Sequence, residues 1–271
     1  MKRLFLHFLP VMFLIGGLGL SEAVEIELTG GLNTYSFKAP SEENSKKNNF
    51  LSNIIGNFSV KGDITGSTSF YMNINRDNIQ HNSLNIRFST RSDFFKFEFG
   101  PFFGLSDDNK FDMGFLGLIE LTFPGIIFFS FSGTATISRS FSFTSDNSRE
   151  SVEAKLGFWL PIVIPSVTFN LKNYSQEAIT NNLTRIFLSA DFYSKTSPVT
   201  FRIDAGYEIL KQIITGEENI KKQNAVFTGI EIIINIAKAR IIAGAEIPFN
   251  LPFNSSQISY KAYAGFGYSF N

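Results

Sequence analysis

The 271-residue chain contains no cysteine, two histidines and one tryptophan. The absence of cysteine excludes disulfides, thiolate metal sites and thiol nucleophiles. Lys and Arg together number 24, and so do Asp and Glu, so the sequence carries no net charge. A nucleic-acid-binding surface needs clustered cations, and this balance argues against a nucleic-acid partner.

Long apolar runs are also missing, except at the N-terminus. There Lys2 and Arg3 precede the run LFLHFLPVMFLIGGLGL, and the small residues Ser21 and Ala23 follow it. This order predicts a secretory signal peptide over residues 1–23, cleaved after Ala23. The alternative is an uncleaved anchor, but breaks in the run and the good cleavage site favour removal. Beyond this segment no run reaches the roughly 20 residues that a membrane-spanning helix needs.

Alternation of apolar and polar residues takes the place of those runs. The stretch FFKFEFGPFFGL, residues 94–105, shows it clearly. Side chains of a strand point alternately to opposite faces, so Phe95, Phe97 and Phe99 share one face and Lys96 and Glu98 the other. The 32 phenylalanines and the many β-branched residues favour strands throughout the chain.

Segments of this kind recur along the whole chain, separated by clusters of turn-forming residues. Pro101 interrupts one of them, and we expect a bulge or a strand end there because proline cannot donate to the ladder. The sequence predicts fourteen strands, near 24–38, 50–60, 64–75, 83–91, 94–105, 113–123, 126–138, 151–160, 166–174, 183–193, 199–210, 224–236, 240–248 and 258–270.

The connectors between these strands alternate between short and long. The short ones are KGD, RSD, PG, PIVIP, SKTSP and AKA. The longer polar loops between them are APSEENSKKNN, RDNIQHN, SDDNKFD, RSFSFTSDNSRE, SQEAITNN, KQIITGEENIKKQ and PFNLPFNSSQ. In an up-and-down meander, alternate connectors lie at the same end. One end therefore has tight turns and the other has longer loops, as in outer-membrane barrels.

The polar faces of the predicted strands carry charges of both signs. Inside a soluble β-sandwich, which is the alternative, each would cost several kcal/mol unless tightly paired. A barrel with lipid outside and water inside accommodates both faces and leaves no unpaired edge. The sequence thus predicts an all-β fold, a single closed antiparallel up-and-down transmembrane β-barrel over residues 24–271 with about 14 strands, or 12 as second choice. The predicted pore-lining residues are Arg87, Lys96, Glu98, Glu120, Glu153, Lys155, Lys172, Arg185, Asp191, Arg202, Asp204, Glu208, Glu231, Arg240, Glu246 and Lys261.

The closing segment ISYKAYAGFGYSFN places Tyr260, Phe266, Tyr268 and Phe270 on one face. It resembles the last strand of bacterial outer-membrane β-barrels, although Asn271 stands where the family usually ends on phenylalanine. The resemblance covers the whole mature chain. It implies a location in the outer membrane and contact with the barrel-assembly machinery. Length and strand count look most like a small monomeric porin.

Catalytic and metal-binding residues are scarce. His81 is the single histidine after the signal peptide, in a predicted loop beside serine, and a solvated loop histidine explains it better than acyl transfer does. The loop acids Asp107, Asp108 and Asp112 lack the glycine-turned spacing of a calcium loop. Phosphate-binding, zinc and nucleophile-elbow motifs are absent. We therefore expect no enzyme activity, no metal and no cofactor.

Three functions fit such a barrel. Fourteen strands tilted about 40° enclose a cylinder roughly 28 Å across, too wide for side chains to fill. This favours a porin-like channel for small hydrophilic solutes over a closed barrel whose interior charges pair and plug it. The alternatives are a closed barrel whose loops bind ligands or stabilise the envelope, and a transporter of hydrophobic molecules.

Overall fold

The computed structural model describes residues 24–33, 54–65, 67–77, 81–105, 111–123, 125–137, 148–176, 179–193, 197–214, 221–251 and 260–270. The predicted signal peptide lies outside these residues and stays a prediction. The described residues form fourteen strands: β1 Val24–Asn33, β2 Ile54–Thr65, β3 Thr68–Asp77, β4 His81–Arg91, β5 Phe95–Leu105, β6 Phe111–Phe123, β7 Ile127–Thr136, β8 Ser148–Phe158, β9 Val163–Gln176, β10 Ile179–Phe192, β11 Val199–Ile214, β12 Lys221–Ile236, β13 Ala239–Leu251 and β14 Lys261–Phe270.

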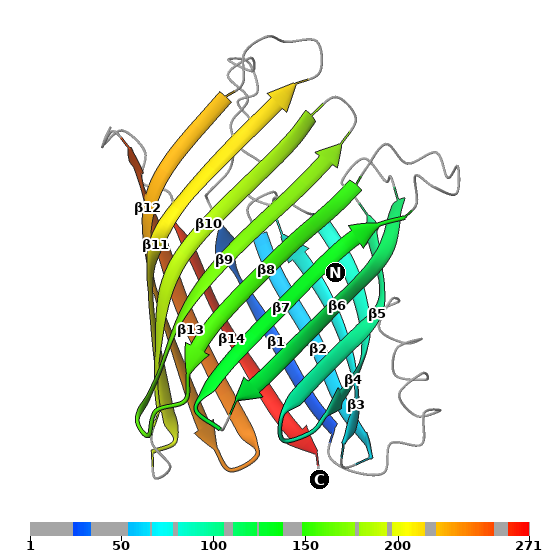
Figure 1. The fold of residues 1–271 in the computed structure, drawn as a ribbon, viewed down its shortest axis with the longest axis vertical. Helices are drawn as coiled ribbons and strands as arrows, with labels where there is room; N and C mark the ends of the chain where they lie inside the picture. Colours follow the sequence, from blue (N-terminus) through cyan, green and yellow to red (C-terminus); the bar gives the residue numbers. More distant parts are fainter. Residues whose placement is uncertain are drawn as a thin grey trace.

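Every strand pairs antiparallel with its neighbours in the chain, and β1 pairs with β14 to close the barrel (Figure 1). The closing ladder runs from Val24 opposite Phe270 to Asn33 opposite Lys261. The first strand therefore begins, and the last strand ends, at the same rim. The predicted closed antiparallel barrel of fourteen strands is confirmed.

Tight connections gather at that rim. The chain needs only residues 92–94 between β4 and β5, and Ala237 and Lys238 between β12 and β13. Ala237 has φ 51°, in the left-handed region that favours glycine, and Gly125 has φ 70° in the β6–β7 turn. Two residues are enough for a β-hairpin when the turn adopts positive φ.

Two local predictions are wrong. Lys61-Gly62-Asp63 is not a turn, because β2 continues to Thr65 and the register with β3 shifts only between Asp63 and Thr65. Pro101 neither ends β5 nor creates a bulge. Its missing N–H leaves a gap in the ladder to β4, and the pairs on both sides of the gap keep the same register.

Strands near the opposite rim are longer than predicted. The segments SQEAITNN and KQIITGEENIKKQ look like loops, yet most of the first belongs to β9 and β10 and most of the second to β11 and β12. β11 and β12 have 16 residues each, against 10 in β1 and in β3. His81 is likewise the first residue of β4 and pairs with Asp77, so the predicted loop there is shorter.

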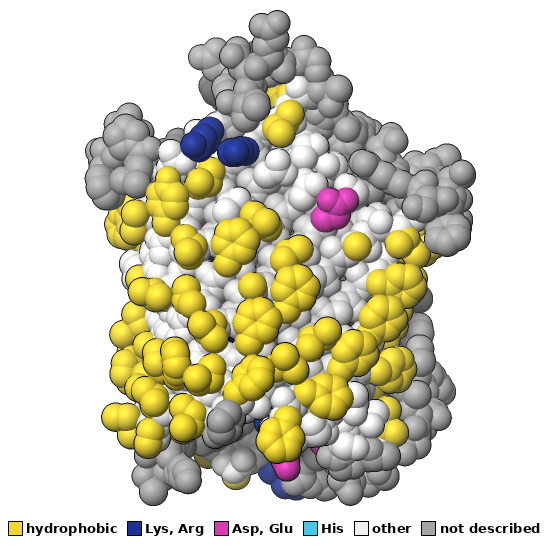
Figure 2. Space-filling view, viewed as in Figure 1, with side chains coloured by type: hydrophobic (Ala, Val, Ile, Leu, Met, Phe, Trp, Pro, Cys, Tyr) yellow, Lys and Arg dark blue, Asp and Glu magenta, His cyan; other side chains and the backbone are white. Residues whose placement is uncertain are grey.

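The outer face of the barrel is apolar. Figure 2 shows hydrophobic side chains over most of one side, with charged ones above and below them. On β5, Phe95, Phe97 and Phe99 are 42%, 41% and 47% exposed. Lys211 on β11 and Lys222 on β12 also point outward and are exposed. They lie opposite each other in the strand register, towards the rim opposite the tight turns. No helix in the described residues is long and apolar enough to cross a membrane.

Candidate functional site

The inner face of the barrel wall is the candidate functional site. Because side chains alternate along each strand, the residues between the exposed apolar ones point inward. All sixteen charged residues named from the sequence, eight basic and eight acidic, occupy inward positions. Their role as a pore lining stays a prediction, while their contacts can be described directly.

One row of contacts crosses β10 to β14. Arg202 forms an ion pair with Asp191 on one side, and its Nη1 lies 3.6 Å from Oε1 of Glu231 on the other. The hydroxyl of Tyr263 donates to the same carboxylate at 2.5 Å. The carboxylate of Asp204, two residues from Arg202 on β11, accepts a hydrogen bond from Ser189 on β10. The row therefore links four strands by polar contacts along the wall.

Arg185 forms a second link on the same side. Its Nε donates to Glu208 at 2.7 Å and its Nη2 to Glu246 at 2.5 Å. The guanidinium carbon lies 4.4 Å from the centre of the Phe227 ring. Stacking and two carboxylates together hold this side chain, and the Glu208 side chain is completely buried.

Glycines opposite aromatic side chains allow the network to lie close to the wall. Gly206 lies between Phe187 and Phe227, whose ring centres are 5.7 Å apart. Gly244 pairs with Tyr263, and a Cβ on Gly244 would stand 2.4 Å from the tyrosine ring. A larger residue at Gly244 would displace the Tyr263 ring, and one at Gly206 would clash with the backbone of β10 at Ile186 and Phe187. Sequence reasoning missed these pairs because glycine and aromatic residue are far apart in the chain.

Contacts on β3 to β5 hold a third group of charges. Nη1 of Arg87 donates to Glu98 at 2.8 Å, and Lys96 contacts the other oxygen of that carboxylate at 2.6 Å. The guanidinium carbon of Arg87 is 4.1 Å from the centre of the Tyr71 ring. Glu120 pairs with Lys96 in the strand register, so it lies on the same part of the wall.

Asp112 and Arg149 are a pair that the sequence analysis did not find. The loop prediction placed Asp112 outside the barrel, but it lies in β6, points inward and is fully buried. Nε of Arg149, on β8, donates to Asp112 at 2.7 Å, and the Arg149 side chain is 5% exposed. Gly104 leaves room for both, because a Cβ there would lie 2.0 Å from Oδ1 of Asp112. The remaining loop acids, Asp107 and Asp108, lie outside the described residues.

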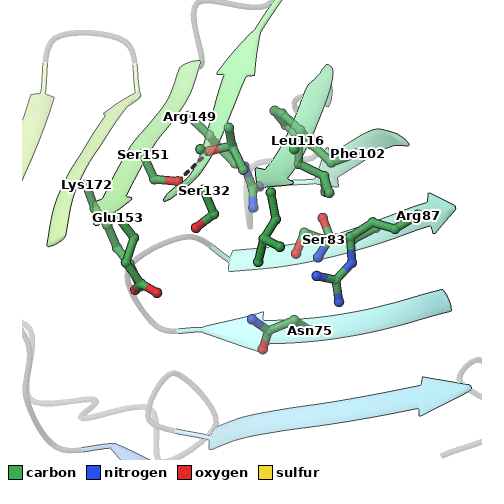
Figure 3. Close-up of a pocket in the computed structure, with 15 residues that line it drawn as sticks. Asn75, Ser83, Arg87, Phe102, Leu116, Ser132, Arg149, Ser151, Glu153 and Lys172 are labelled. Carbon is green, nitrogen blue, oxygen red and sulfur yellow. Dashed lines mark hydrogen bonds between the residues drawn. The ribbon is translucent and has the colours of Figure 1, made fainter. Parts of the chain in front are cut away.

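A pocket of about 380 Å³ opens on the inner wall between β3 and β9 (Figure 3). Arg87, Arg149, Glu153 and Lys172 are its charged lining residues. Lys172 also lines a second pocket of about 260 Å³, together with residues of β1, β2, β3 and β14. Because β9 is remote from β1 and β2 around the barrel, Lys172 faces the space between opposite walls.

The other predicted residues have separate contacts. Glu153 accepts a hydrogen bond from Asn170 at 2.7 Å. Arg240 pairs with Glu27 at 3.2 Å near the tight-turn rim. The last two residues are lysines that lie above aromatic rings. Nζ of Lys155 is 5.6 Å from the centre of the Phe128 ring, and Nζ of Lys261 is 5.7 Å from that of Tyr263. Within the described residues, no three His, Cys, Asp or Glu side chains are grouped so as to hold a metal ion.

Comparison with known proteins places this geometry among membrane barrels. No protein-family model matches the sequence, and no curated protein does. The structure is similar to a bacterial polysaccharide outer membrane secretin, at 8% identity and TM-score 0.54 over 92% of this chain and 98% of that one. An outer membrane channel from Pseudomonas putida F1 is similar at 8% identity and TM-score 0.52, over 92% of this chain and 95% of the other.

OmpT, an outer-membrane protein of Vibrio cholerae, aligns over 92% of this chain and 97% of its own, with 9% identity and TM-score 0.47. Identities this low show a shared fold and nothing finer. The closed ladder, the apolar outer face and the two more similar structures lead to one conclusion. The chain has the fold of the bacterial outer-membrane β-barrels.

Proposed function

We propose that the protein is a monomeric, porin-like channel that lets small hydrophilic solutes diffuse across the outer membrane. The exposed apolar residues of the outer face fit a hydrocarbon layer, and the closed ladder leaves no unpaired edge in it. The inner wall then faces water. Charges of both signs on that wall fit a hydrated passage.

The observation that carries the proposal is the way the inner charges are arranged. Arg185 lies against the Phe227 ring, and Tyr263 extends over Gly244 towards Glu231. Each of these contacts follows the wall across one intervening strand, from β10 to β12 and from β14 to β12. A closed anchor would instead use such residues to fill the interior. Pockets of about 380 and 570 Å³ on the inner side, the larger near the tight-turn rim, leave space between the walls.

Electrical recording tests the proposal. Protein refolded into planar lipid bilayers should give discrete conductance steps, whereas the same protein kept unfolded in urea should give none. The sixteen inner-wall charges named above are eight basic and eight acidic, so we expect a reversal potential close to zero in a salt gradient. Silent bilayers containing correctly folded protein would contradict the channel function.

Export and assembly complete the proposal. Cleavage after Ala23 would leave Val24, the first residue of β1, at the mature N-terminus. The outward aromatic residues Phe266, Tyr268 and Phe270 on β14 would contact the barrel-assembly machinery. N-terminal sequencing of the protein from an outer-membrane fraction tests the cleavage site, and a start other than Val24 would contradict it.

A further inference from the structure

We infer that the lysine pair Lys211 and Lys222, on the outer surface of the barrel, binds the phosphate of an anionic lipid headgroup. The two residues lie opposite each other on β11 and β12, and both side chains point outward and are exposed. The inference goes beyond the proposed channel, because it needs no conduction. It requires that the apolar outer face of the barrel lies in a membrane.

The lysine pair is a doubly positive site without a counter-charge beside it. Like charges directly opposite each other destabilise two paired strands, and an anion between them removes that cost. The Cβ atoms of such opposite residues are about 5 Å apart, so both ammonium groups can reach one phosphate. The described outward neighbours of the pair, across and along the strands, are all uncharged: Asn182, Ile209, Ile213 and Asn224.

An acidic residue does occur in the same outward row, but far from the pair. The row runs from Glu150 on β8 through Asn173 and Asn182 to Lys211. Three strand spacings of about 4.8 Å put Glu150 about 14 Å from Lys211, which exceeds the Debye length of about 8 Å at physiological salt. The Glu150 carboxylate accepts a hydrogen bond from Asn173 at 3.1 Å. Figure 2 shows two basic side chains side by side above the hydrophobic ones, with an acidic side chain apart from them.

The height of the lysine pair matches that of a lipid headgroup. Val199 begins β11 at the tight-turn rim, and Lys211 lies twelve residues farther along the strand. A rise of about 3.4 Å per residue and a tilt of about 40° place Lys211 about 31 Å above Val199 along the membrane normal. An apolar band about 25 Å tall that begins at Val199 therefore ends about 6 Å below the pair. Phosphates that are attached to acyl chains lie in the same layer.

The wall below the lysine pair favours a lipid over a free anion. On β11 and β12 the outward residues Tyr207, Val226, Ile203 and Ile230 are between 36% and 45% exposed, and they lie towards the tight-turn rim. An acyl chain can lie along these side chains while the phosphate of the same molecule contacts the lysines. The two contacts then support each other, because the first holds the phosphate close to the second. Inorganic phosphate makes the lysine contact alone.

Native mass spectrometry of the folded protein in detergent micelles tests the inference, with phosphatidic acid and phosphatidylcholine of identical acyl chains as probes. A lysine near an anionic membrane surface contributes a factor of about five to affinity, so the parent should bind phosphatidic acid about 25-fold more tightly than phosphatidylcholine. Inorganic phosphate at the same concentration as the lipid should not displace phosphatidic acid.

Glutamine variants localise the site, and they should keep the fold because both side chains are exposed. Lys211→Gln and Lys222→Gln should each weaken phosphatidic acid binding about fivefold and together about 25-fold, with phosphatidylcholine binding unchanged. Lys211→Arg keeps the charge and should bind like the parent. Lys238→Gln is the matched control, since this exposed lysine lies between β12 and β13 at the opposite rim and its loss should leave phosphatidic acid binding unchanged.

Equal affinity of the parent for the two lipids would overturn the inference. So would equal losses in Lys211→Gln and Lys238→Gln, or displacement of phosphatidic acid by an equal concentration of inorganic phosphate, which would indicate a site for free anions. Glu217 and Glu218 belong to the connector between β11 and β12, outside the described residues. If these acids neutralised the lysine pair, the double variant would bind phosphatidic acid like the parent, and the lipid site would be refuted.

Failure of this site and failure of the channel can be told apart. Phosphatidic acid binding that depends on the lysine pair, in a protein that leaves planar bilayers silent, would refute the channel and leave the lipid site standing. Conductance steps with no preference for phosphatidic acid would do the reverse.

Discussion

Arginine substitutions along β5 should destabilise the barrel in proportion to their depth in the membrane. Antiparallel strands rise about 3.4 Å per residue, and a tilt of about 40° converts this to about 2.6 Å along the membrane normal. Phe95 begins β5 at the tight-turn rim, so Phe97 lies about 5 Å and Phe99 about 10 Å deeper. The middle of an apolar band about 25 Å tall is therefore near Phe99.

The expected costs follow from these depths. Phe99→Arg should lower the free energy of unfolding by about 2–4 kcal/mol, Phe97→Arg by about 1–2 and Phe95→Arg by about 0–1. Phe99 also stacks on Phe115, with ring centres 5.3 Å apart, and Phe99→Ala measures the loss of that contact and of the ring. Equilibrium urea titration in lipid vesicles measures all four values.

Lys96→Gln is the control on the opposite face. Lys96 contacts Glu98, which retains Arg87, so this change should cost less than about 1 kcal/mol. A flat profile across the three arginine variants would refute the depth reasoning. If Phe99→Arg folded as well as the parent while Lys96→Gln failed, the two faces would be inverted.

Four further substitutions can be measured by the same urea titration. Asp112→Ala removes the carboxylate that Nε of the buried Arg149 contacts and should cost about 3–5 kcal/mol, and a cost below about 1 kcal/mol would show that the pair is solvated. Gly206→Ala would place a Cβ 2.5 Å from the backbone oxygen of Ile186 and should cost about 1–3 kcal/mol. Gly30→Ala, with open space around the new Cβ, should instead stabilise the protein by about 0.4–1 kcal/mol. Ala237→Gly should stabilise by about 0.5–1 kcal/mol by relieving the left-handed backbone, and destabilisation would contradict that reading.

Much of this fold follows from alternation alone. A period of two separates Phe97 from Lys96 whatever the neighbouring strands are, so the strand number and the two faces could be predicted from the sequence. The ends of the strands are harder to predict from the sequence. Gly62 sits in a triplet that resembles a turn, but a strand tolerates glycine, and only pairing with Phe70 shows that β2 continues.

The contacts of the inner wall depend on register between strands. Asp112 and Arg149 are 37 positions apart, and each lies in a polar segment that is typical of a loop. Tyr263 and Gly244 meet only because β13 and β14 pair in one particular register. Local patterns do not determine these alignments. The sequence therefore predicts which residues face inward, and the structure adds which of them touch.

The unequal strand lengths make one rim of the barrel oblique. β11 and β12 exceed β1 and β3 by six residues, which corresponds to roughly 15 Å along the membrane normal. If the membrane covers an equal height of every strand, the surplus of β11 and β12 lies beyond the membrane, with Lys211 and Lys222 on its outer side. As far as the described strands define this rim, it is high at β11 and β12 and low at β1 and β3. If the protein is the channel proposed above, a solute would reach the inner wall from the low side.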